Sequence, residues 1–370
     1  MPGERILILS ASIGEGHDLP ARVLAEGIRE AEPRAEVRIQ DFLAFIRPVL
    51  RRIIMGGSQF HSEWGGRMFD LEFKLITEVR PTIWIAGTFM RATGGRATER
   101  AVAAARPDVV VSTYPGATEV LGQLRQRGRV RVPVVSAITD LAALRYWAHP
   151  AVDLHLITHP ESAEEVRAIA PASEIVCVRG LTDRSFYESR DRSEARRALG
   201  LPADRPIVLV SGGGWAVGDL AGAAEEATAD GATAVCLCGR NEEVRQALAG
   251  RFAGDDRVVV LGFSDRMAGL MAAADVLVHS TAGLTVLEAL MEGCRVVSYG
   301  WGHGHVRVNN EAYRRFGLAR VAADRDELRR ALADSLADPR APDRSFESLP
   351  EAASLVLKAA HPGGLGETGL

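Results

Sequence analysis

Short apolar runs alternate with longer segments of helical spacing along most of the 370-residue chain. Runs without polar alternation are typical of parallel strands buried on both faces, and the segments between them of the helices that cover such a sheet. A first series of strands is expected at 5–12, 36–42, 108–113, 132–139, 153–158 and 174–180. A second series is expected at 206–214, 233–239, 257–263, 275–280 and 295–300.

The two series are separated by a polar and charged segment from Leu181 to Arg205, which we interpret as an interdomain linker. A chain of this length also exceeds one ordinary hydrophobic core. Two successive sets of parallel strands predict an α/β fold of two Rossmann-like domains whose sheets face each other across a cleft. The expected domains are residues 1–182 and 200–340, followed at 341–370 by a helix and a disordered tail.

Residues 43–93 depart from this alternation and read as apolar helical pieces broken by glycine and proline. Aromatic and methionine side chains are mixed there with arginines: Trp64, Trp84, Phe89 and Met90 among Arg47, Arg51, Arg52, Arg67 and Arg91. The mixture favours peripheral contact with an anionic membrane through residues 42–106. Helices packed on the sheet with outward arginines would give the same pattern, so both interpretations stay open.

Charge is distributed unevenly. The net charge is −4, yet residues 42–131 hold fourteen Lys and Arg against seven Asp and Glu, a local excess of +7 that leaves −11 for the remainder. Every cationic side chain except Lys74 and Lys358 is an arginine, the residue best suited to contacts with phosphate groups.

Composition indicates a cytoplasmic protein, at most peripheral at the inner face of the membrane. No run reaches the roughly 18–20 apolar residues of a membrane span, and the N-terminus enters a strand without a signal peptide. The four cysteines read as buried free thiols, in or beside strands at Cys177, Cys236, Cys238 and Cys294. A disulfide or metal role for the Cys236–Cys238 pair is the disfavoured alternative.

Residues 261–310 carry the clearest chemical signal. A buried strand ends at His279, and a helix with apolar spacing at Leu284, Leu287 and Leu290 follows, so Ser280 or Thr281 is expected to cap the helix. The backbone N–H groups at such a helix start attract a phosphate. Glu288, one turn further, could accept hydrogen bonds from both hydroxyls of a ribose, and the combination predicts a nucleotide diphosphate site.

Two common nucleotide motifs are missing. Neither SGGGWAVG after the strand at 206 nor SIGEGH after the first strand matches the dinucleotide fingerprint, and no Walker lysine is present. This argues against an ATPase, and nothing in the sequence indicates a nucleic-acid partner.

Five motifs in the second half, in fixed order, resemble a known family. They are SGGG (211–214), CGRN (238–241), GF with a following Met-x-x-Leu-Met (262–271), AD-x-L-x-H-S-x-A-G-L-T-x-x-E-A-L (274–290) and the region of Asn309. Together they resemble the metal-independent, two-domain GT-B glycosyltransferases of family 28. The nearest branch is that of the monogalactosyldiacylglycerol synthases and the processive diacylglycerol glucosyltransferases.

The resemblance implies a UDP-sugar donor, no cofactor and no metal, and a set of donor contacts. Gly212, Gly213 and Gly214 would approach the diphosphate; Gly239, Arg240 and Asn241 would line the nucleotide pocket; Gly262 and Phe263 would hold the uracil. The phosphate-binding turn would consist of Ser280, Ala282, Gly283, Leu284 and Thr285, with Glu288 on the ribose.

In the first half, SIGEGH resembles the glycine-rich acceptor loop of the family and brings in Gly14, Gly16 and His17. A hydroxyl acceptor must lose a proton as it attacks the anomeric carbon, and a neutral imidazole can take it, so His17 is the predicted general base. His17 could instead cap the following helix or orient the diphosphate. Asp140 resembles the aspartate at a strand end in this branch, as a rival base or an orienter of His17.

The sugar-contacting motif departs from the family pattern. Where relatives often have Gly-Gln-Glu-x-x-Asn, this chain keeps Gly304 and Asn309 but has His305-Val306 between them, so the donor sugar is not named. His303 and His305 lack a third metal ligand nearby and read as sugar or phosphate contacts. Asp324 and Asp326 read as a helix N-terminus.

The predicted function is an inverting transfer of a hexose from a UDP-sugar to a hydroxyl acceptor, with a membrane lipid such as diacylglycerol as the acceptor. Three alternatives share the predicted donor site: a transferase acting on a soluble secondary metabolite, a UDP-sugar 2-epimerase, and a non-enzymatic UDP-sugar sensor.

Overall fold

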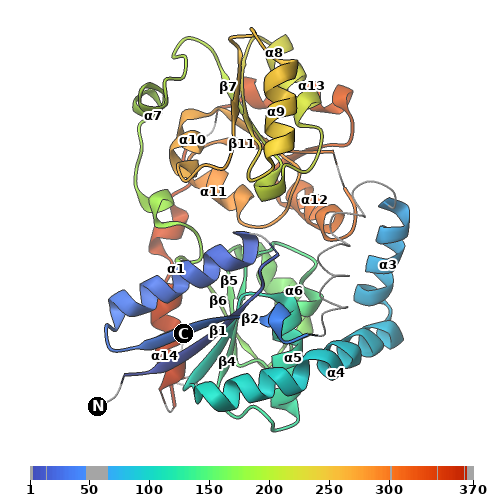
Figure 1. Cartoon of the computed structure of the whole chain (residues 1–370), viewed down its shortest axis with the longest axis vertical. Coiled ribbons are helices and arrows are strands. Elements are labelled where there is room, and N and C mark those ends of the chain that lie inside the picture. The colour runs from blue at the N-terminus through green and yellow to red at the C-terminus, as the bar shows by residue number, and fades with distance from the viewer. Residues whose placement is uncertain are drawn as a thin grey trace. The chain divides into compact units, whose positions relative to one another are not determined.

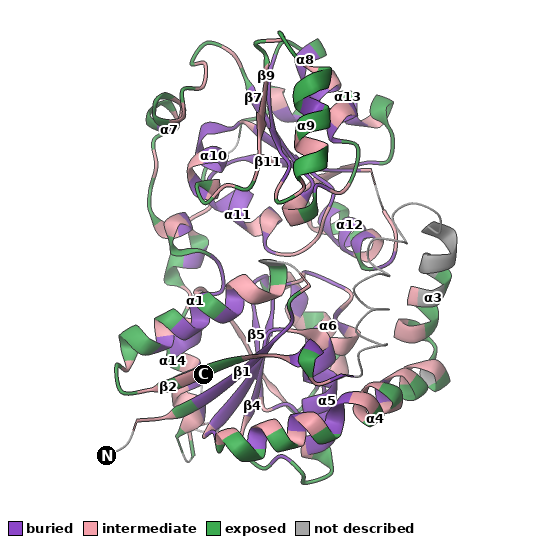
Figure 2. Ribbon diagram, in the orientation of Figure 1, coloured by how far each residue is buried: buried purple, intermediate pink, exposed green. Residues whose placement is uncertain are grey.

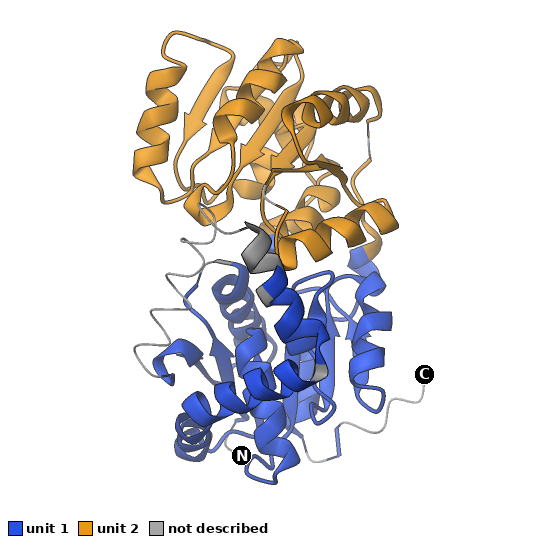
Figure 3. Ribbon diagram, turned by 90° about the vertical axis from the view of Figure 1, so that its right-hand side faces the viewer, with its two compact units in different colours: residues 1–184, 346–370 blue, residues 185–345 orange. Residues whose placement is uncertain are grey.

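The computed structural model of the chain describes residues 3–13, 15–46, 66–300, 302–339, 341–361 and 363–364. It divides into two compact units, residues 1–184 with 346–370 and residues 185–345 (Figure 3). Each unit is built around one sheet of six parallel strands with helices on both faces (Figure 1). The expectation of two Rossmann-like folds is therefore confirmed.

The sheet of the N-terminal unit has the order β2-β1-β3-β4-β5-β6. Its strands are β1 (Arg5–Ser10), β2 (Glu36–Asp41), β3 (Val109–Ser112), β4 (Val134–Ile138), β5 (Leu154–Ile157) and β6 (Glu174–Cys177). Its helices are α1 (Glu15–Ala31), α3 (Gly66–Glu78), α4 (Arg80–Ala105), α5 (Pro115–Gln126), α6 (Ala163–Ile169) and α14 (Ala352–Ala360).

Alternate residues of β1 contribute to two cores of this unit, one on each face of the sheet. Ile6 and Ile8 pack with buried residues of α1 and α14, whereas Leu7 and Leu9 pack with α4 and α5 on the other face. All four side chains are buried, as the strands of Figure 2 show. Helices cover both faces of the sheet, which explains why its strands are continuous apolar runs. Such runs therefore predicted parallel strands correctly.

The C-terminal unit has the strand order β12-β11-β10-β7-β8-β9. Its strands are β7 (Ile207–Ser211), β8 (Thr233–Leu237), β9 (Val258–Leu261), β10 (Val276–His279), β11 (Arg295–Tyr299) and β12 (Arg320–Ala322). Its helices are α7 (Arg192–Leu199), α8 (Leu220–Ala229), α9 (Glu242–Arg251), α10 (Met267–Ala273), α11 (Thr285–Met291), α12 (His305–Phe316) and α13 (Arg325–Ala337).

Several helices of this unit begin at a capping side chain. Asp219, Asn241 and Asp324 precede α8, α9 and α13, and each accepts a hydrogen bond from the backbone N–H three residues later. These bonds satisfy N–H groups that have no partner within the helix. Asp324 is therefore a helix cap, as the sequence predicted.

The expected linker is wrong in part. Residues 192–199 form α7, whose Ala195 packs against Ala272 and Ala273 at the end of α10. Arg196 donates to Asp275 at 2.7 Å and holds α7 on the C-terminal unit. The segment is charged because only one narrow face of α7 is buried. The short strand β12 was not expected at all.

The last helix returns to the N-terminal unit. Ala352, Ala353, Val356 and Ala359 of α14 are buried in the core that contains α1. An isolated bridge between Arg179 and Glu351 and their 3.1 Å ion pair fix the start of the helix. The helix expected within 341–370 is thus present, and it supplies part of a core.

Within 43–93, the structure confirms helices in the part that it describes from residue 66 onward. Pro81 stands in the first turn of α4 and separates it from α3, but α4 continues through Gly87. A Cβ at Gly87 would lie 2.5 Å from Oε1 of Glu119 on α5, so glycine here permits close packing. Arg47, Arg51, Arg52 and Trp64 lie outside the described residues, as does the side chain of Arg67.

Candidate functional site

In both sheets the strand order reverses beside the first strand. The reversal lies between β1 and β3 in the N-terminal unit and between β7 and β10 in the C-terminal unit. Loops leaving neighbouring strands diverge at such a point and form the usual ligand-binding position at the carboxyl ends of the strands. Most of the predicted site residues follow these strands, and each unit can be considered by itself.

In the C-terminal unit, the loop after β7 depends on its glycines. A Cβ at Gly212 would lie 2.4 Å from the backbone nitrogen of Val217, and Gly213 has a φ of 68°. The loop makes one short 3-10 turn at Gly213–Trp215 before α8 begins. An ordinary side chain would open this turn, so a bound group can approach its backbone closely.

The loop after β8 is bonded to the loop after β7. The N–H of Arg240 donates to the carbonyl oxygen of Gly214 at 2.8 Å, and Nδ2 of Asn241 donates to the carbonyl oxygen of Trp215 at 3.2 Å. Gly239 has a φ of 53°, and a Cβ there would lie 2.5 Å from the oxygen of Gly214. The predicted residues 212–214 and 239–241 therefore form one connected surface.

The turn after β10 lies against the same loop. A Cβ added at Gly218 would be 2.3 Å from Oγ of Ser280, and one added at Gly213 would be 3.4 Å from Cγ2 of Thr281. Gly283, with a φ of 98°, lets the chain turn before α11. The structure thus brings Ser280 to Gly218 and Thr281 to Gly213 in the loop after β7, and the rest of the turn, Ala282 to Thr285, leads on into α11.

The expected helix cap is wrong. α11 begins at Thr285, with Leu284 at the cap position and no side-chain capping bond. Ser280 is buried in its contact with Gly218, and Thr281 donates its backbone N–H to Nδ1 of His279 at 3.4 Å. The residues between Thr281 and Thr285 form a turn instead of a helix start, with Gly283 at a positive φ.

Phe263 and Arg240 form the most open part of this surface. The Phe263 ring is 54% exposed, and the Arg240 guanidinium carbon lies 4.3 Å from its centroid. Gly262, just before it, would place a Cβ 3.7 Å from the oxygen of Gly239. An exposed aromatic ring beside a guanidinium group offers a stacking face together with a cation for a phosphate.

The remaining donor-side residues differ in accessibility. Glu288 is buried in the first turn of α11. Gly304 precedes α12 with a φ of 57°, and His305 is exposed in the first turn. Asn309 is fully buried, and its Nδ2 donates to the carbonyl oxygen of His305 at 2.8 Å. Asn309 therefore supports the backbone of its helix, and His305 is the accessible group of this segment.

His279 was not predicted as a site residue. It is buried at the end of β10, where burial lowers its pKa to about 4, so the ring is neutral near pH 7. Nδ1 accepts the N–H of Thr281, and no hydrogen-bond partner for Nε2 appears among the described residues. The sequence offered one sign of this role, namely a histidine at the end of an otherwise apolar strand.

In the N-terminal unit, His17 lies at the reversal between β1 and β3. It stands in the first turn of α1, and its Nδ1 is 3.1 Å from the carbonyl oxygen of Thr113, just after β3. A carbonyl oxygen can only accept, so Nδ1 carries the hydrogen and the lone pair is on Nε2. His17 is inside the helix and does not cap it.

The backbone around His17 is held by three strand ends. The carbonyl oxygen of His17 accepts from Oγ of Ser10 at 3.1 Å and from Oγ1 of Thr113 at 3.0 Å. The hydroxyl of Thr139, after β4, donates to the carbonyl oxygen of Gly16 at 3.4 Å. The imidazole is thereby fixed relative to the sheet. Gly14 lies outside the described residues.

Asp140 reaches His17 through a tryptophan. Its Oδ2 accepts from Nε1 of Trp147 at 2.9 Å, and the Trp147 ring lies 5.6 Å from the imidazole of His17, centroid to centroid. Tyr114 packs on the imidazole from another side, with its ring 5.2 Å away. The group that orients Nδ1 of His17 is thus the Thr113 carbonyl, and Asp140 fixes the aromatic wall.

The cysteines and the helices allow two further findings. All four cysteines are free; Cys236, Cys238 and Cys294 are buried, and Cys177 is half-buried. No helix among the described residues is long and apolar enough to cross a membrane.

Two parts of the chain match protein-family models. Residues 17–182 match the monogalactosyldiacylglycerol (MGDG) synthases, and residues 214–338 match the glycosyl transferases group 1. The first match begins at His17 and includes Asp140. The second contains Gly214 and all predicted donor residues that follow it.

Two curated relatives have the same description, processive diacylglycerol beta-glucosyltransferase. The protein from Bacillus subtilis (strain 168) is 23% identical over 90% of this chain and 87% of its own length. The protein from Staphylococcus carnosus (strain TM300) is 23% identical over 70% of this chain, and the match spans 65% of that protein.

A solved structure extends the similarity to the whole fold. Arabidopsis thaliana UGT89C1, crystallised in complex with UDP, superposes with a TM-score of 0.53 at 13% identity and covers 90% of each chain. At this identity the likeness concerns the fold, which is that of two Rossmann-like units.

Proposed function

We propose that this chain is a GT-B glycosyltransferase of the monogalactosyldiacylglycerol synthase and processive diacylglycerol glucosyltransferase branch. In this proposal it transfers a hexose from a UDP-sugar to a hydroxyl group of a membrane lipid such as diacylglycerol. The observation that carries this proposal is His17, with its Nδ1 hydrogen on the Thr113 carbonyl and its basic nitrogen at the strand reversal of the N-terminal unit.

The reaction assigned to His17 is a proton transfer coupled to a single displacement. Nε2 takes the proton of the acceptor hydroxyl while the oxygen attacks the anomeric carbon, and the bond from that carbon to the β-phosphate oxygen breaks. UDP leaves with the bonding electrons, and the anomeric configuration is inverted. Asp140 is the alternative base, although its hydrogen bond to Trp147 favours a positioning role.

UDP is assigned to the connected loops of the C-terminal unit. Backbone N–H groups around Gly212–Gly214 and in the turn from Ser280 to Thr285 would bind the diphosphate and stabilise its charge as it leaves. Phe263 would stack on the uracil, with Arg240 beside it, and Glu288 would accept from the ribose. Gly304 and His305 are the proposed contacts for the sugar, because the Asn309 amide is already engaged.

A lipid acceptor is supported by the surface of α3 and α4. Six of the nine large apolar side chains exposed in the described residues lie there: Leu71, Leu75, Val79, Trp84, Ile85 and Phe89. Such a concentration is typical of surfaces that contact membranes or partners. Met90 differs, because it packs against the core of the sheet. We propose that this surface brings the enzyme to the inner face of the membrane.

The test is transfer of radiolabelled hexose from UDP-glucose and UDP-galactose to vesicles containing diacylglycerol, with a soluble phenolic acceptor and no acceptor as parallel arms. We expect a labelled glycolipid of inverted anomeric configuration. Transfer only to the soluble acceptor would overturn the lipid assignment, and isomerisation of the donor without an acceptor would indicate an epimerase. Calorimetric titration with UDP tests the donor site separately, since a chain that binds no UDP cannot act as proposed.

A further inference from the structure

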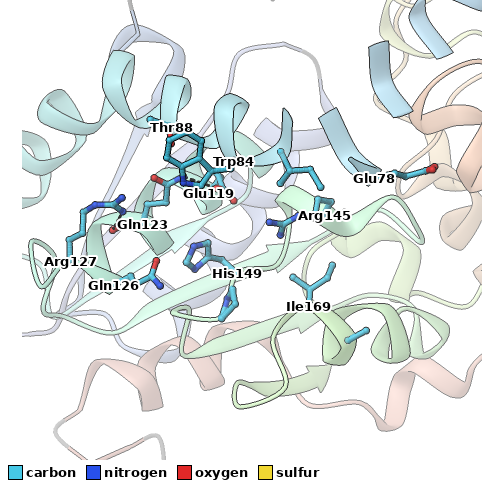
Figure 4. Close-up of a pocket in the computed structure, with 13 residues that line it drawn as sticks. Glu78, Trp84, Thr88, Glu119, Gln123, Gln126, Arg127, Arg145, His149 and Ile169 are labelled. Carbon is cyan, nitrogen blue, oxygen red and sulfur yellow. Dashed lines mark hydrogen bonds between the residues drawn. The ribbon is translucent and has the colours of Figure 1, made fainter. Parts of the chain in front are cut away.

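A cavity lies in the N-terminal unit, between α4, α5, the segment that precedes β5 and the end of α6 (Figure 4). Its volume is about 630 Å³, within the range of roughly 300–1,000 Å³ that is usual for small-molecule sites. It shares no residue with the predicted donor contacts or with His17 and Asp140. Its lining is therefore not explained by the reaction proposed above.

The inner wall is a buried carboxyl–amide pair on α5. Gln123 donates from Nε2 to Oε1 of Glu119 at 2.7 Å, and its own Oε1 accepts from Nε of Arg91 at 3.0 Å. Glu119 is 5% exposed, and its Oε2 has no hydrogen-bond partner among the described residues. Burial raises the pKa of this carboxyl. An unsatisfied buried oxygen is costly unless a ligand or water satisfies it.

Hydrogen-bond donors face this wall. His149 accepts the N–H of Ala151 at Nδ1, so the hydrogen of its neutral ring is on Nε2. Burial, with help from two nearby arginines, lowers the pKa of His149 to about 4 and keeps the ring neutral. The side chains of Gln126 and Arg145 also line the cavity, and the guanidinium carbon of Arg145 lies 5.9 Å from the centroid of the Tyr146 ring. Donors and acceptors are thus available on facing walls.

An aromatic ring stands at the edge of the polar cavity. Trp84 on α4 lines it while remaining 70% exposed, and Ile83 and Ile169 add apolar contact. A flat ring of this kind can pack against the C–H face of a ligand whose edge carries polar groups. The lining therefore suits a ligand that is apolar on one face and polar around its rim.

The charges of the lining argue against an ionic ligand. Arg127 and Arg145 contribute two guanidinium groups, and Glu78 and Glu119 contribute two carboxyl groups. An anion would meet the carboxyl groups, and a cation would meet the guanidinium groups. A hydroxyl group, by contrast, donates once and accepts twice, so a polyhydroxyl ring can satisfy both kinds of wall.

We propose that this cavity is a second carbohydrate site, which binds one or two uncharged sugar rings against Trp84 with their hydroxyls on Glu119, His149 and Gln126. The sugar could be a free glycoside or the head group of a glycolipid. Exposed Ile85 follows Trp84 on α4, and exposed Phe89 lies one turn beyond Ile85; both could contact lipid chains, which favours the glycolipid. This goes beyond the proposed transfer, because binding here requires no donor.

The test is calorimetric titration of the full chain with methyl β-glucoside and, separately, co-sedimentation with phosphatidylcholine vesicles that contain a glucosylated diacylglycerol. Trp84→Ala and Gln126→Ala change exposed side chains, so the fold is expected to persist, and circular dichroism checks this. We expect each to weaken sugar binding about tenfold, the equivalent of about 1.4 kcal/mol. Ile85→Ala is the matched control on the same helix and should leave methyl glucoside binding unchanged.

The two arms identify the source of the sugar. If the protein binds both the soluble glycoside and the glycolipid vesicles, the cavity is a general sugar site. If it binds only the vesicles, and both variants lose that binding, the ligand is a glycolipid head group. Sugar binding that neither variant weakens would overturn the proposal, as would the absence of binding to both methyl β-glucoside and the glycolipid vesicles. UDP titrations on the same samples separate this outcome from failure of the transferase proposal, since none of these variants lies in the donor loops.

Discussion

At the residue scale, Gly239 joins the loops that follow β7 and β8. Gly239 cannot accommodate a side chain, for two reasons. Its φ is 53°, and a Cβ would lie only 2.5 Å from the Gly214 oxygen. Its neighbour Arg240 donates to that same oxygen. A side chain at 239 would therefore separate the two loops that we assign to UDP.

Gly239→Ala is expected to lower the free energy of unfolding by about 3 kcal/mol, because backbone strain adds to the steric clash. UDP affinity should fall at least about tenfold. Urea denaturation and calorimetric titration measure the two effects. The matched control is Gly231→Ala: Gly231 has a φ of 79° but no heavy atom within 4 Å of its Cβ position. It should cost only about 1 kcal/mol and leave UDP binding intact; equal losses in both variants would contradict the assigned role of Gly239.

Individual residues could be predicted from the sequence only where a motif fixed their position. His17 and Thr113 are 96 residues apart, so their hydrogen bond depends on the strand order and could not be deduced locally. Ser280 was wrongly expected to cap a helix, because a serine before an apolar periodic run gives the same local pattern whether or not a turn intervenes. The packing of Ser280 on Gly218 distinguishes the turn from a helix cap, and this tertiary contact cannot be read from the local sequence.

At the element scale, α14 shows how a terminal helix can complete a distant core. Its buried face consists of Ala352, Ala353, Val356 and Ala359, and it packs against α1 from the beginning of the chain. Small side chains allow the two helices to approach closely. The N-terminal unit therefore depends on residues that follow the whole C-terminal unit in sequence.

Val356→Ala should destabilise the N-terminal unit by about 2 kcal/mol through the cavity that it leaves. Ser354→Ala, on the exposed side of the same helix, should change stability by less than about 0.5 kcal/mol. Thermal unfolding followed by tryptophan fluorescence compares the two variants. An unchanged melting temperature for Val356→Ala would mean that α14 is not part of the cooperative unit.

The elements predicted best were those with a continuous apolar run. Eleven expected strands appear in the structure, each within a few residues of its expected bounds. The twelfth, β12, has three residues and too short a run to separate from a loop. Helix α7 was missed for a different reason: arginines and acidic residues dominate it, and the ion pairs of Arg192 and Arg196 with Asp275 hold it in place.

At the scale of the whole molecule, the two units repeat one principle. Each has a parallel sheet with a single reversal beside its first strand, and each places most of its predicted site residues at that reversal. The number of sheets could be predicted from hydrophobic runs alone. The assignment of the last helix to the first unit could not, because the sequence does not reveal which sheet a helix covers.

The most direct test of the account is the turnover number of His17→Ala with saturating UDP-sugar and diacylglycerol vesicles, measured together with UDP affinity. Loss of a general base predicts that turnover falls by about 10²–10⁴-fold. UDP affinity should stay within about twofold of the unmodified protein, because the donor contacts lie in the other unit. Asp140→Asn, in parallel, should retain more activity than His17→Ala. Full turnover by His17→Ala would contradict the account and transfer the role of base to Asp140.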